Sequence, residues 1–170
     1  MNSILEKLAG GDLRSDGEAD NMARRIIEQP DLLPYLMEGF QSNNEIIRMR
    51  TAHAVEVVSR QNGDLLETFK AQLIQQAKTD TLPETRWHLA QVFGNLSLSD
   101  QETQDVLPIL FEFLTTGTTL VRAWAVVGLA NIAKSKPFFK AKILKEITTH
   151  ESDQSQAVRN RVKQALRTLT

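Results

Sequence analysis

Arginine recurs along this sequence at nearly constant spacing, and its guanidinium group could hold a carboxylate or a phosphate. The four arginines stand at positions 48, 86, 122 and 159, so the successive steps are 38, 36 and 37 residues. A guanidinium binds both kinds of anion through paired hydrogen bonds. It can also brace a fold by pairing with neighbouring segments. The regular interval favours the bracing role, because constant spacing is typical of a structural repeat.

Residues for metal, cofactor or acid–base chemistry show no comparable pattern. His53, His88 and His150 lack the short spacing of helical zinc ligands such as H-E-x-x-H. The chain has no cysteine to act as a thiolate ligand or nucleophile, and no lysine-bearing phosphate loop follows the paired glycines at 10–11. We therefore predict no catalytic residue, no metal and no cofactor, and we expect that the protein is not an enzyme.

The elements that position the arginines repeat with a period of about 37 residues. Residues 31–50 align with 105–124 without a gap, at an offset of 74, which corresponds to two periods. Counted from each arginine as zero, positions +3, +6, +7 and +10 predict one buried stripe on an α-helix. The stripe residues are Thr51, Ala54, Val55 and Val58; Leu89, Val92, Phe93 and Leu96; Ala125, Gly128, Leu129 and Ile132; and Val162, Ala165, Leu166 and Leu169.

Each of these second helices follows an apolar first helical segment, and a polar stretch separates the two. Ser99 and Glu102 have the spacing of a capping box, which predicts that a first helix begins near Ser99. No segment alternates with period two for long enough to predict a strand. The sequence predicts an all-α superhelix of about five helical hairpins forming one domain over residues 1–170. The expected units are a degenerate first repeat at 1–30 and successive repeats at 31–61, 64–97, 101–135 and 138–170.

In this organisation the chain resembles the HEAT-repeat family, whose unit is a helical hairpin of similar length. The segment LVRAWAVVGLANIA matches the family's second helix closely, and the resemblance covers residues 30–170. It implies a short right-handed, armadillo-like α-solenoid with a ladder of arginines and aspartates between repeats. The ladder residues would be Arg48, Arg86, Arg122, Arg159, Asp80 and Asp153. Ser42 and Thr116 stand where the family has an aspartate before Arg48 and Arg122, so the ladder is expected to be incomplete.

The composition and the hydrophobic pattern of the chain indicate the compartment in which we expect the protein. Hydrophobic residues make up 41% of the chain and charged residues 24%, which is typical of a globular protein. The absence of cysteine fits a reducing compartment. The first residues show no signal-peptide pattern, and no apolar run approaches the roughly 18 residues of a membrane span. We expect a cytoplasmic protein with no membrane association.

The face of the second helices that points away from the first helices is the candidate binding surface. The family resemblance implies that this face is the concave side of the solenoid. Its centre is apolar and aromatic, which suggests a groove for a peptide or helix. The candidate residues are Arg50, His53, Trp87, His88, Gln91, Trp124, Val127, Asn131, Arg161, Gln164 and Arg167. We predict a non-enzymatic scaffold or adaptor that binds a protein or peptide partner.

The charge of the second helices leaves nucleic-acid binding open as an alternative function. The second-helix segments 18–29, 45–60, 84–97, 119–135 and 155–169 hold 12 basic and 6 acidic residues. The first-helix segments 2–9, 31–41, 64–79, 101–114 and 138–151 hold 6 basic and 10 acidic residues. A basic face could follow a phosphate backbone, as implied by a weak resemblance to HEAT-like DNA glycosylases. A pI near 6.3 argues against nucleic acid, and a third hypothesis makes the face an oligomer interface.

Overall fold

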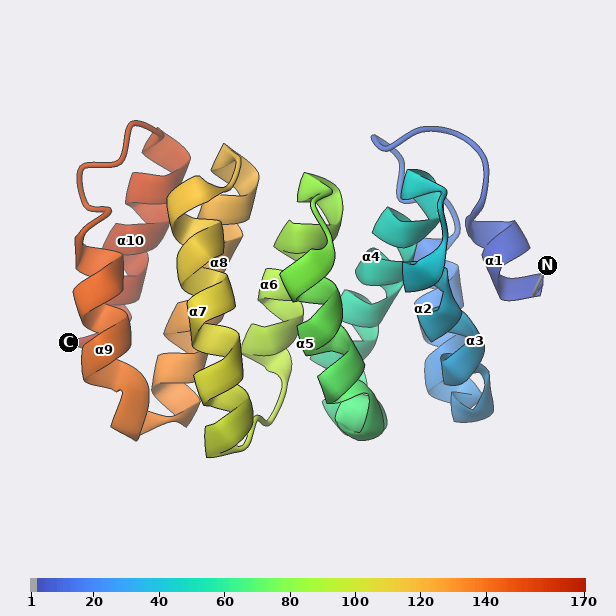
Figure 1. The fold of residues 1–170 in the computed structure, drawn as a ribbon, viewed down its shortest axis with the longest axis horizontal. Coiled ribbons are helices and arrows are strands. Elements are labelled where there is room, and N and C mark those ends of the chain that lie inside the picture. The colour runs from blue at the N-terminus through green and yellow to red at the C-terminus, as the bar shows by residue number, and fades with distance from the viewer. Residues whose placement is uncertain (1–2) are drawn as a thin grey trace. The chain divides into compact units, whose positions relative to one another are not determined.

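The computed structural model describes residues 3–170, and all regular structure among them is helical (Figure 1). The residues form two compact units, here called unit 1 and unit 2, which divide between Leu89 and Ala90. This division falls inside helix α6 (Pro83–Asn95), so the helix contributes its first half to unit 1 and its second half to unit 2. The all-α class predicted from the sequence is confirmed for the described residues.

Unit 1 is organised around α4 (Glu45–Asn62), the second helix of the repeat at 31–61. Both α1 (Ser3–Leu8) and α2 (Ala19–Glu28) pack against α4. The first half of the same repeat is not one continuous helix. It consists of the 3-10 turn η1 (Pro30–Leu32), the short helix α3 (Leu33–Met37) and the 3-10 turn η2 (Glu38–Gln41).

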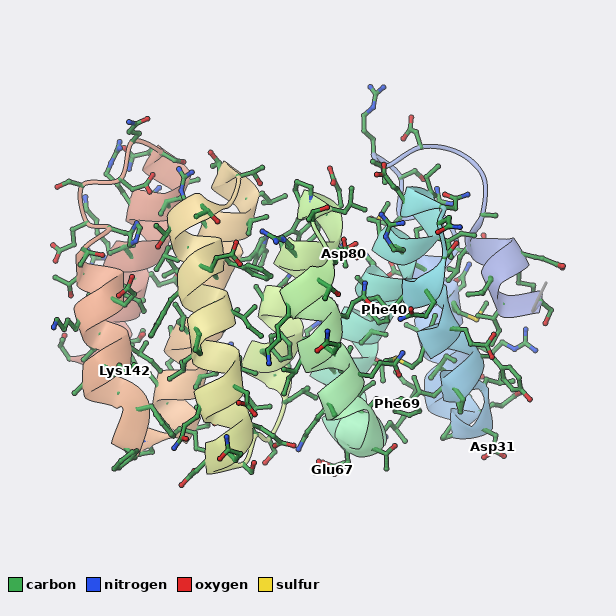
Figure 2. The ribbon with its side chains drawn as sticks, in the orientation of Figure 1. Asp31, Phe40, Glu67, Phe69, Asp80 and Lys142 are labelled. Atoms are coloured by element: carbon green, nitrogen blue, oxygen red, sulfur yellow. The ribbon has the colours of Figure 1, made fainter. Side chains whose placement is uncertain are left out.

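The next repeat of unit 1 begins with the 3-10 segment η3 (Gly63–Phe69), which leads into α5 (Lys70–Thr79). Asp80 follows α5 directly and lies in extended backbone conformation (Figure 2). Its carboxylate accepts a hydrogen bond from the Leu82 amide at 2.9 Å and one from the Gln76 side chain at 2.8 Å. These contacts fix the loop between α5 and α6.

Unit 2 is organised around α8 (Thr119–Ser135), which packs against α7 (Asp100–Thr116), α9 (Pro137–Thr148) and α10 (Gln156–Leu169). The capping box predicted at the start of α7 is confirmed. The Ser99 hydroxyl accepts from the Glu102 amide at 3.1 Å, and the Glu102 carboxylate accepts from the Ser99 amide at 2.7 Å. The box satisfies amides that the first turn of a helix leaves without an intrahelical partner.

The apolar stripe predicted on the second helices is buried, except that Leu166 is half-buried. Burial of a large aliphatic or aromatic side chain contributes about 1.5–3 kcal/mol, so the stripe supplies much of the driving force for folding. Glycine is needed at position 128, because the Cβ of any other residue would lie 2.3 Å from the Ala90 carbonyl oxygen. The small residue at +6 of α8 therefore reflects the close approach of α6 and α8 within unit 2.

Candidate functional site

The position-zero arginines fold back onto the loops that precede their own helices. Each guanidinium donates a hydrogen bond to a backbone carbonyl five or six residues earlier, so it closes the loop against the first turn of the second helix. The four contacts are Arg48 Nη1 to Ser42 O at 2.9 Å, Arg86 Nε to Asp80 O at 2.7 Å, Arg122 Nη1 to Gly117 O at 3.0 Å, and Arg159 Nη1 to Asp153 O at 2.5 Å.

Two of these arginines also reach an aspartate of the following repeat. Arg122 Nη2 donates to Asp153 Oδ1 at 3.0 Å in unit 2, and Arg48 Nε lies 3.5 Å from Asp80 Oδ2 in unit 1. The expectation that Arg48 and Arg122 lack an aspartate is therefore wrong. The partner comes from the next hairpin rather than from the arginine's own repeat.

The Arg122–Asp153 pair depends on an ionised carboxylate. Burial of Asp153 opposes ionisation, but hydrogen bonds from the Ser155 amide and Arg122, the charge of Arg122 and a hydrogen bond from His150 outweigh it. The net result is that the pKa of Asp153 lies below its ordinary value. The pair therefore stabilises the fold above the ordinary carboxyl pKa, and that contribution is lost as pH falls through the lowered pKa.

Arg50 is enclosed by the N-terminal loop instead of lining a binding face. Arg50 is only 3% exposed to solvent. Its guanidinium donates hydrogen bonds to backbone carbonyls in the segment from the end of α1 to residue 15. The acceptors are Leu8 O at 2.9 Å, Ala9 O at 3.4 Å, Gly10 O at 2.7 Å, Asp12 O at 3.5 Å and Ser15 O at 3.0 Å. The hypothesis that Arg50 contacts a ligand is wrong, because these carbonyls occupy its donors.

His88 is also inside unit 1 and not on a binding face, since it is 1% exposed. Its ring stacks on Trp87 with centroids 3.5 Å apart and meets the His53 ring edge-on at 4.8 Å. Neither His88 ring nitrogen makes a hydrogen bond within the described residues. Burial and the neighbouring His53 lower the pKa of His88 to about 3, so the ring is neutral at physiological pH.

His53 is half-buried and lies between two carboxylates that flank the start of α2. Its Nε2 is 2.9 Å from Asp20 and its Nδ1 is 3.3 Å from Asp16. These contacts attach the N-terminal segment to α4 beside Arg50. The described residues contain no group of three or more His, Cys, Asp or Glu side chains that could hold a metal ion.

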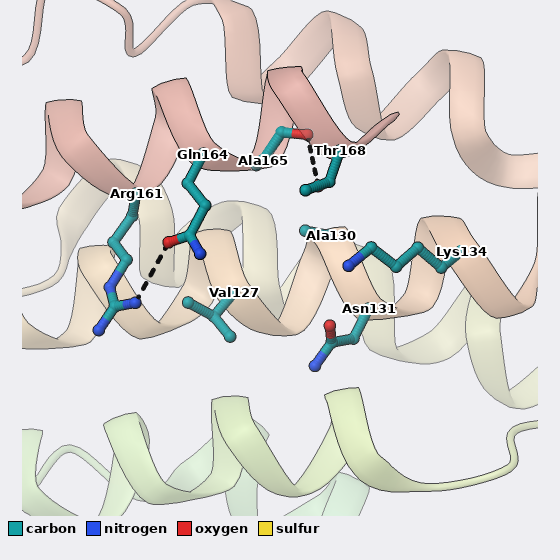
Figure 3. Close-up of a pocket in the computed structure, with 8 residues that line it drawn as sticks. All are labelled: Val127, Ala130, Asn131, Lys134, Arg161, Gln164, Ala165 and Thr168. Carbon is teal, nitrogen blue, oxygen red and sulfur yellow. Dashed lines mark hydrogen bonds between the residues drawn. The ribbon is translucent and has the colours of Figure 1, made fainter. Parts of the chain in front are cut away.

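In unit 2 the predicted face is open, and a pocket of about 100 Å³ lies between α8 and α10 (Figure 3). Val127, Ala130 and Ala165 supply apolar walls, and Asn131 and Gln164 supply amide groups. Lys134, Arg161 and Thr168 complete the lining. This set is called the α8–α10 pocket below. Arg161 Nη1 lies 3.5 Å from the Gln164 side-chain oxygen, and the Arg161 guanidinium centre lies 5.1 Å from the centre of the Trp124 ring.

The pattern that defines HEAT repeats matches residues 71–167, which is more than half of the chain. The chain belongs to the HEAT-repeat family. The resemblance inferred from LVRAWAVVGLANIA is thereby confirmed. A search of curated protein sequences found no match.

Two solved structures with similar folds are an engineered protein and a designed repeat protein. An engineered protein superposes with a TM-score of 0.69 at 18% identity, over 98% of this chain and 79% of its own. A computationally designed armadillo repeat protein for modular peptide recognition gives a TM-score of 0.63 at 16% identity, over 97% of this chain and 72% of its own. At these identities the likeness shows the fold, and the armadillo-like α-solenoid predicted for this HEAT-repeat chain is confirmed.

The structure brings together only part of the predicted site. Val127, Asn131, Arg161 and Gln164 line the α8–α10 pocket. Arg167 lines an adjoining depression on α10 that shares Gln164 and Thr168 with the pocket. Gln91 is half-buried on α6, and Trp87 and His53 are half-buried residues of unit 1.

Sequence reasoning missed Lys134, Ala165 and Thr168 as lining residues of the pocket. Lys134 lies twelve residues after Arg122, beyond the last position of the stripe used for the prediction. Extending the helical face by one more turn would have included it.

None of the helices in residues 3–170 is long and apolar enough to cross a membrane.

Proposed function

We propose that this HEAT-repeat chain is a non-enzymatic scaffold that binds a protein segment on the exposed face of its second helices. The observation that carries the proposal is the α8–α10 pocket, which combines apolar walls with amide and cationic groups. The residues proposed to bind within unit 2 are Trp124, Val127, Asn131, Arg161, Gln164 and Arg167. The likeness to an armadillo design made for peptide recognition supports a peptide as the ligand class.

The size of the pocket favours one side chain of a peptide over a small molecule. Sites for small molecules and cofactors usually have volumes of about 300–1,000 Å³. The α8–α10 pocket measures about 100 Å³, which is enough for an aliphatic side chain. A partner would therefore insert one residue and lay its flanking residues along α8 and α10.

The compartment proposed for the scaffold is the cytoplasm. The chain contains no cysteine and so needs no oxidising environment to form disulfides. Fractionation of cells that express the tagged protein would place it, and recovery outside the cytoplasm would contradict this part of the proposal.

Selection of a random peptide display library on the immobilised protein tests the binding function directly. Enriched peptides should bind the protein in solution by fluorescence polarisation. The substitution Val127→Arg, which places a long charged side chain at the pocket, should weaken that binding at least about tenfold, or 1.4 kcal/mol.

The control is Leu120→Arg, which makes the same chemical change in the same helix at an exposed residue outside the pocket. Circular dichroism and urea unfolding must show that both variants fold. Failure to enrich any peptide, or equal affinity for the two variants, would contradict the proposed function.

A further inference from the structure

The two helices that form the α8–α10 pocket carry only positive charge. Helices α8 and α10 together contain six basic residues and no aspartate or glutamate. Unit 2 as a whole has 10 basic and 7 acidic residues, a net charge of +3, whereas unit 1 has 10 basic and 14 acidic residues, a net charge of −4. The positive charge of unit 2 is thus concentrated where the pocket lies.

Two of the six cations are occupied within the fold. Arg122 pairs with Asp153, and Arg159 donates to the carbonyls of Asp153 and Gln154. The other four form no ion pair within the described residues: Lys134, Arg161, Lys163 and Arg167. Four unneutralised cations on adjacent helices attract an anion.

The four cations surround the pocket and its neighbouring depression. Lys134 and Arg161 line the pocket, and Lys163 and Arg167 line the depression on α10. Arg161 is held in place over the Trp124 ring, and such contact of a guanidinium with an aromatic face is stabilising. A ligand would meet an apolar hole with positive charge on both sides.

We propose that the α8–α10 pocket binds an acidic segment of a partner protein, with an aliphatic side chain in the hole and flanking Asp or Glu residues facing the four cations. This inference rests on the proposed function and names the chemistry of the partner. The carboxylates would pair with Lys134 and Arg161 on the pocket side, and with Lys163 and Arg167 on the α10 side. Pairing of complementary charges across an interface gives specificity and speeds association.

The same positive charge is a poorer match for nucleic acid. Single-stranded nucleic acids bind through bases stacked on open aromatic faces, but the Trp124 ring already has Arg161 over it. The apolar walls formed by Val127, Ala130 and Ala165 suit a hydrocarbon side chain and not a phosphate. The net charge of the whole chain is −1, which gives no general attraction for a polyanion.

The composition of peptides enriched from the random display library tests this inference. Enriched peptides should share Asp or Glu on both sides of a Leu, Ile or Val, and their affinity should fall as salt is raised. The triple variant Lys134→Gln/Lys163→Gln/Arg167→Gln should bind a representative enriched peptide at least about tenfold more weakly. All three substituted residues are exposed, so the variant is expected to fold.

A matched control removes the same charge from another helix of unit 2. The variant Lys140→Gln/Lys142→Gln/Lys145→Gln on α9 should change affinity less than about twofold, because none of these residues lines the pocket. Equal losses in the two triple variants would show a general charge effect and overturn the inference.

The remaining outcomes separate the inference from the proposed function. Enriched peptides that are neutral or basic, yet lose affinity on Val127→Arg, would overturn the acidic partner and leave the scaffold function standing. No enriched peptide at all would overturn both. Displacement of the bound peptide by a short single-stranded oligonucleotide, with tighter binding of the oligonucleotide, would favour nucleic acid instead. Concentration-dependent dimerisation that the triple variant on α8 and α10 abolishes would show that a second copy is the occupant.

Discussion

Arg50 and Arg161 occupy the same position in their repeats, two residues after the position-zero arginine, but they have opposite environments. Arg50 in unit 1 is enclosed by backbone carbonyls of the N-terminal loop. Arg161 in unit 2 is half-buried at an open pocket, over the ring of Trp124. The position in the repeat therefore sets the direction of a side chain from its helix, and other segments decide whether solvent reaches it.

The faces around these two arginines differ in the same way. On α4, Met49 and Glu56 stand one and eight residues after the position-zero arginine, where the helix register points away from the first helices, and both are buried. On α10, the equivalent Asn160 and Arg167 are exposed. Helices α1 and α2 pack on α4, and their connecting loop wraps around Arg50. Equivalent positions are therefore closed on α4 of unit 1 and open on α10 of unit 2, whereas on α8 Ala123 and Ala130 are buried and Val127 is half-buried.

Substitution of Arg50 and, separately, of Arg161 tests the contrast between the two units, and it is expected to give the largest difference in stability. The substitution Arg50→Ala should lower the free energy of unfolding by about 4 kcal/mol, because it removes several charge-assisted hydrogen bonds from a buried group. The substitution Arg161→Ala should cost less than about 1 kcal/mol. Urea unfolding of both variants measures the difference. Similar losses in the two would contradict the contrast between the units.

Burial of His88 on α6 also makes unit 1 sensitive to acid. The pKa of His88 in the folded protein is about 3, below the ordinary value of 6.5, so between these values the unfolded chain binds a proton that the folded protein does not. Keeping His88 neutral therefore adds to the free energy of unfolding. This addition is complete above pH 6.5 and is lost as pH falls, by about 3 kcal/mol at pH 4.

The variant His88→Phe keeps an aromatic ring beside Trp87 and cannot be protonated. Its free energy of unfolding should therefore fall less between pH 7 and pH 4 than that of the unsubstituted protein. The measurement is urea unfolding at both pH values. If the two proteins lost the same amount of stability, the neutral buried histidine would not be the cause of the acid sensitivity.

A smaller effect is expected from glycines of the loop that closes unit 1. Gly17 has a φ of +53°, and a Cβ there would lie 2.6 Å from Arg50 Cζ. Gly10 has a φ of +84°, and a Cβ there would meet nothing within 4 Å. The substitution Gly17→Ala should therefore cost about 2 kcal/mol and Gly10→Ala about 1 kcal/mol, the excess coming from displacement of the guanidinium. Thermal unfolding compares them, and a larger loss for Gly10→Ala would be the opposite of the expected order.

Local patterns in the sequence predicted the second helices closely. The segments expected at 45–60 and 119–135 became α4 (Glu45–Asn62) and α8 (Thr119–Ser135), and the capping box at Ser99 formed as spaced. These features depend on contacts three or four residues apart, which a sequence displays directly. The segment 31–41 was less predictable, since it divided into α3 and two 3-10 turns.

Only part of the candidate site could be predicted from the sequence, because helix register sets the direction of a side chain but not what covers it. Val127, Asn131, Arg161 and Gln164 face one pocket because two neighbouring helices follow the same register. Arg50 has the same register and is buried because the N-terminal loop packs over it on α4. His88 on α6 is buried as well, with the rings of His53 and Trp87 against it. The sequence of residues 3–17 shows no periodicity that predicts where the N-terminal loop lies.

The sequence by itself determined that this protein is a stack of helical hairpins, which side of each second helix is buried, and where the structural arginines stand. The period of the apolar stripe carries that information, since helix geometry converts spacing into direction. Only the tertiary structure decided which outward faces stay open and which aspartates Arg48 and Arg122 meet. Arg122 found Asp153 thirty-one residues later, and Arg50 found the carbonyls of a loop before it. Such contacts depend on how separate hairpins pack, and spacing within one helix does not encode them.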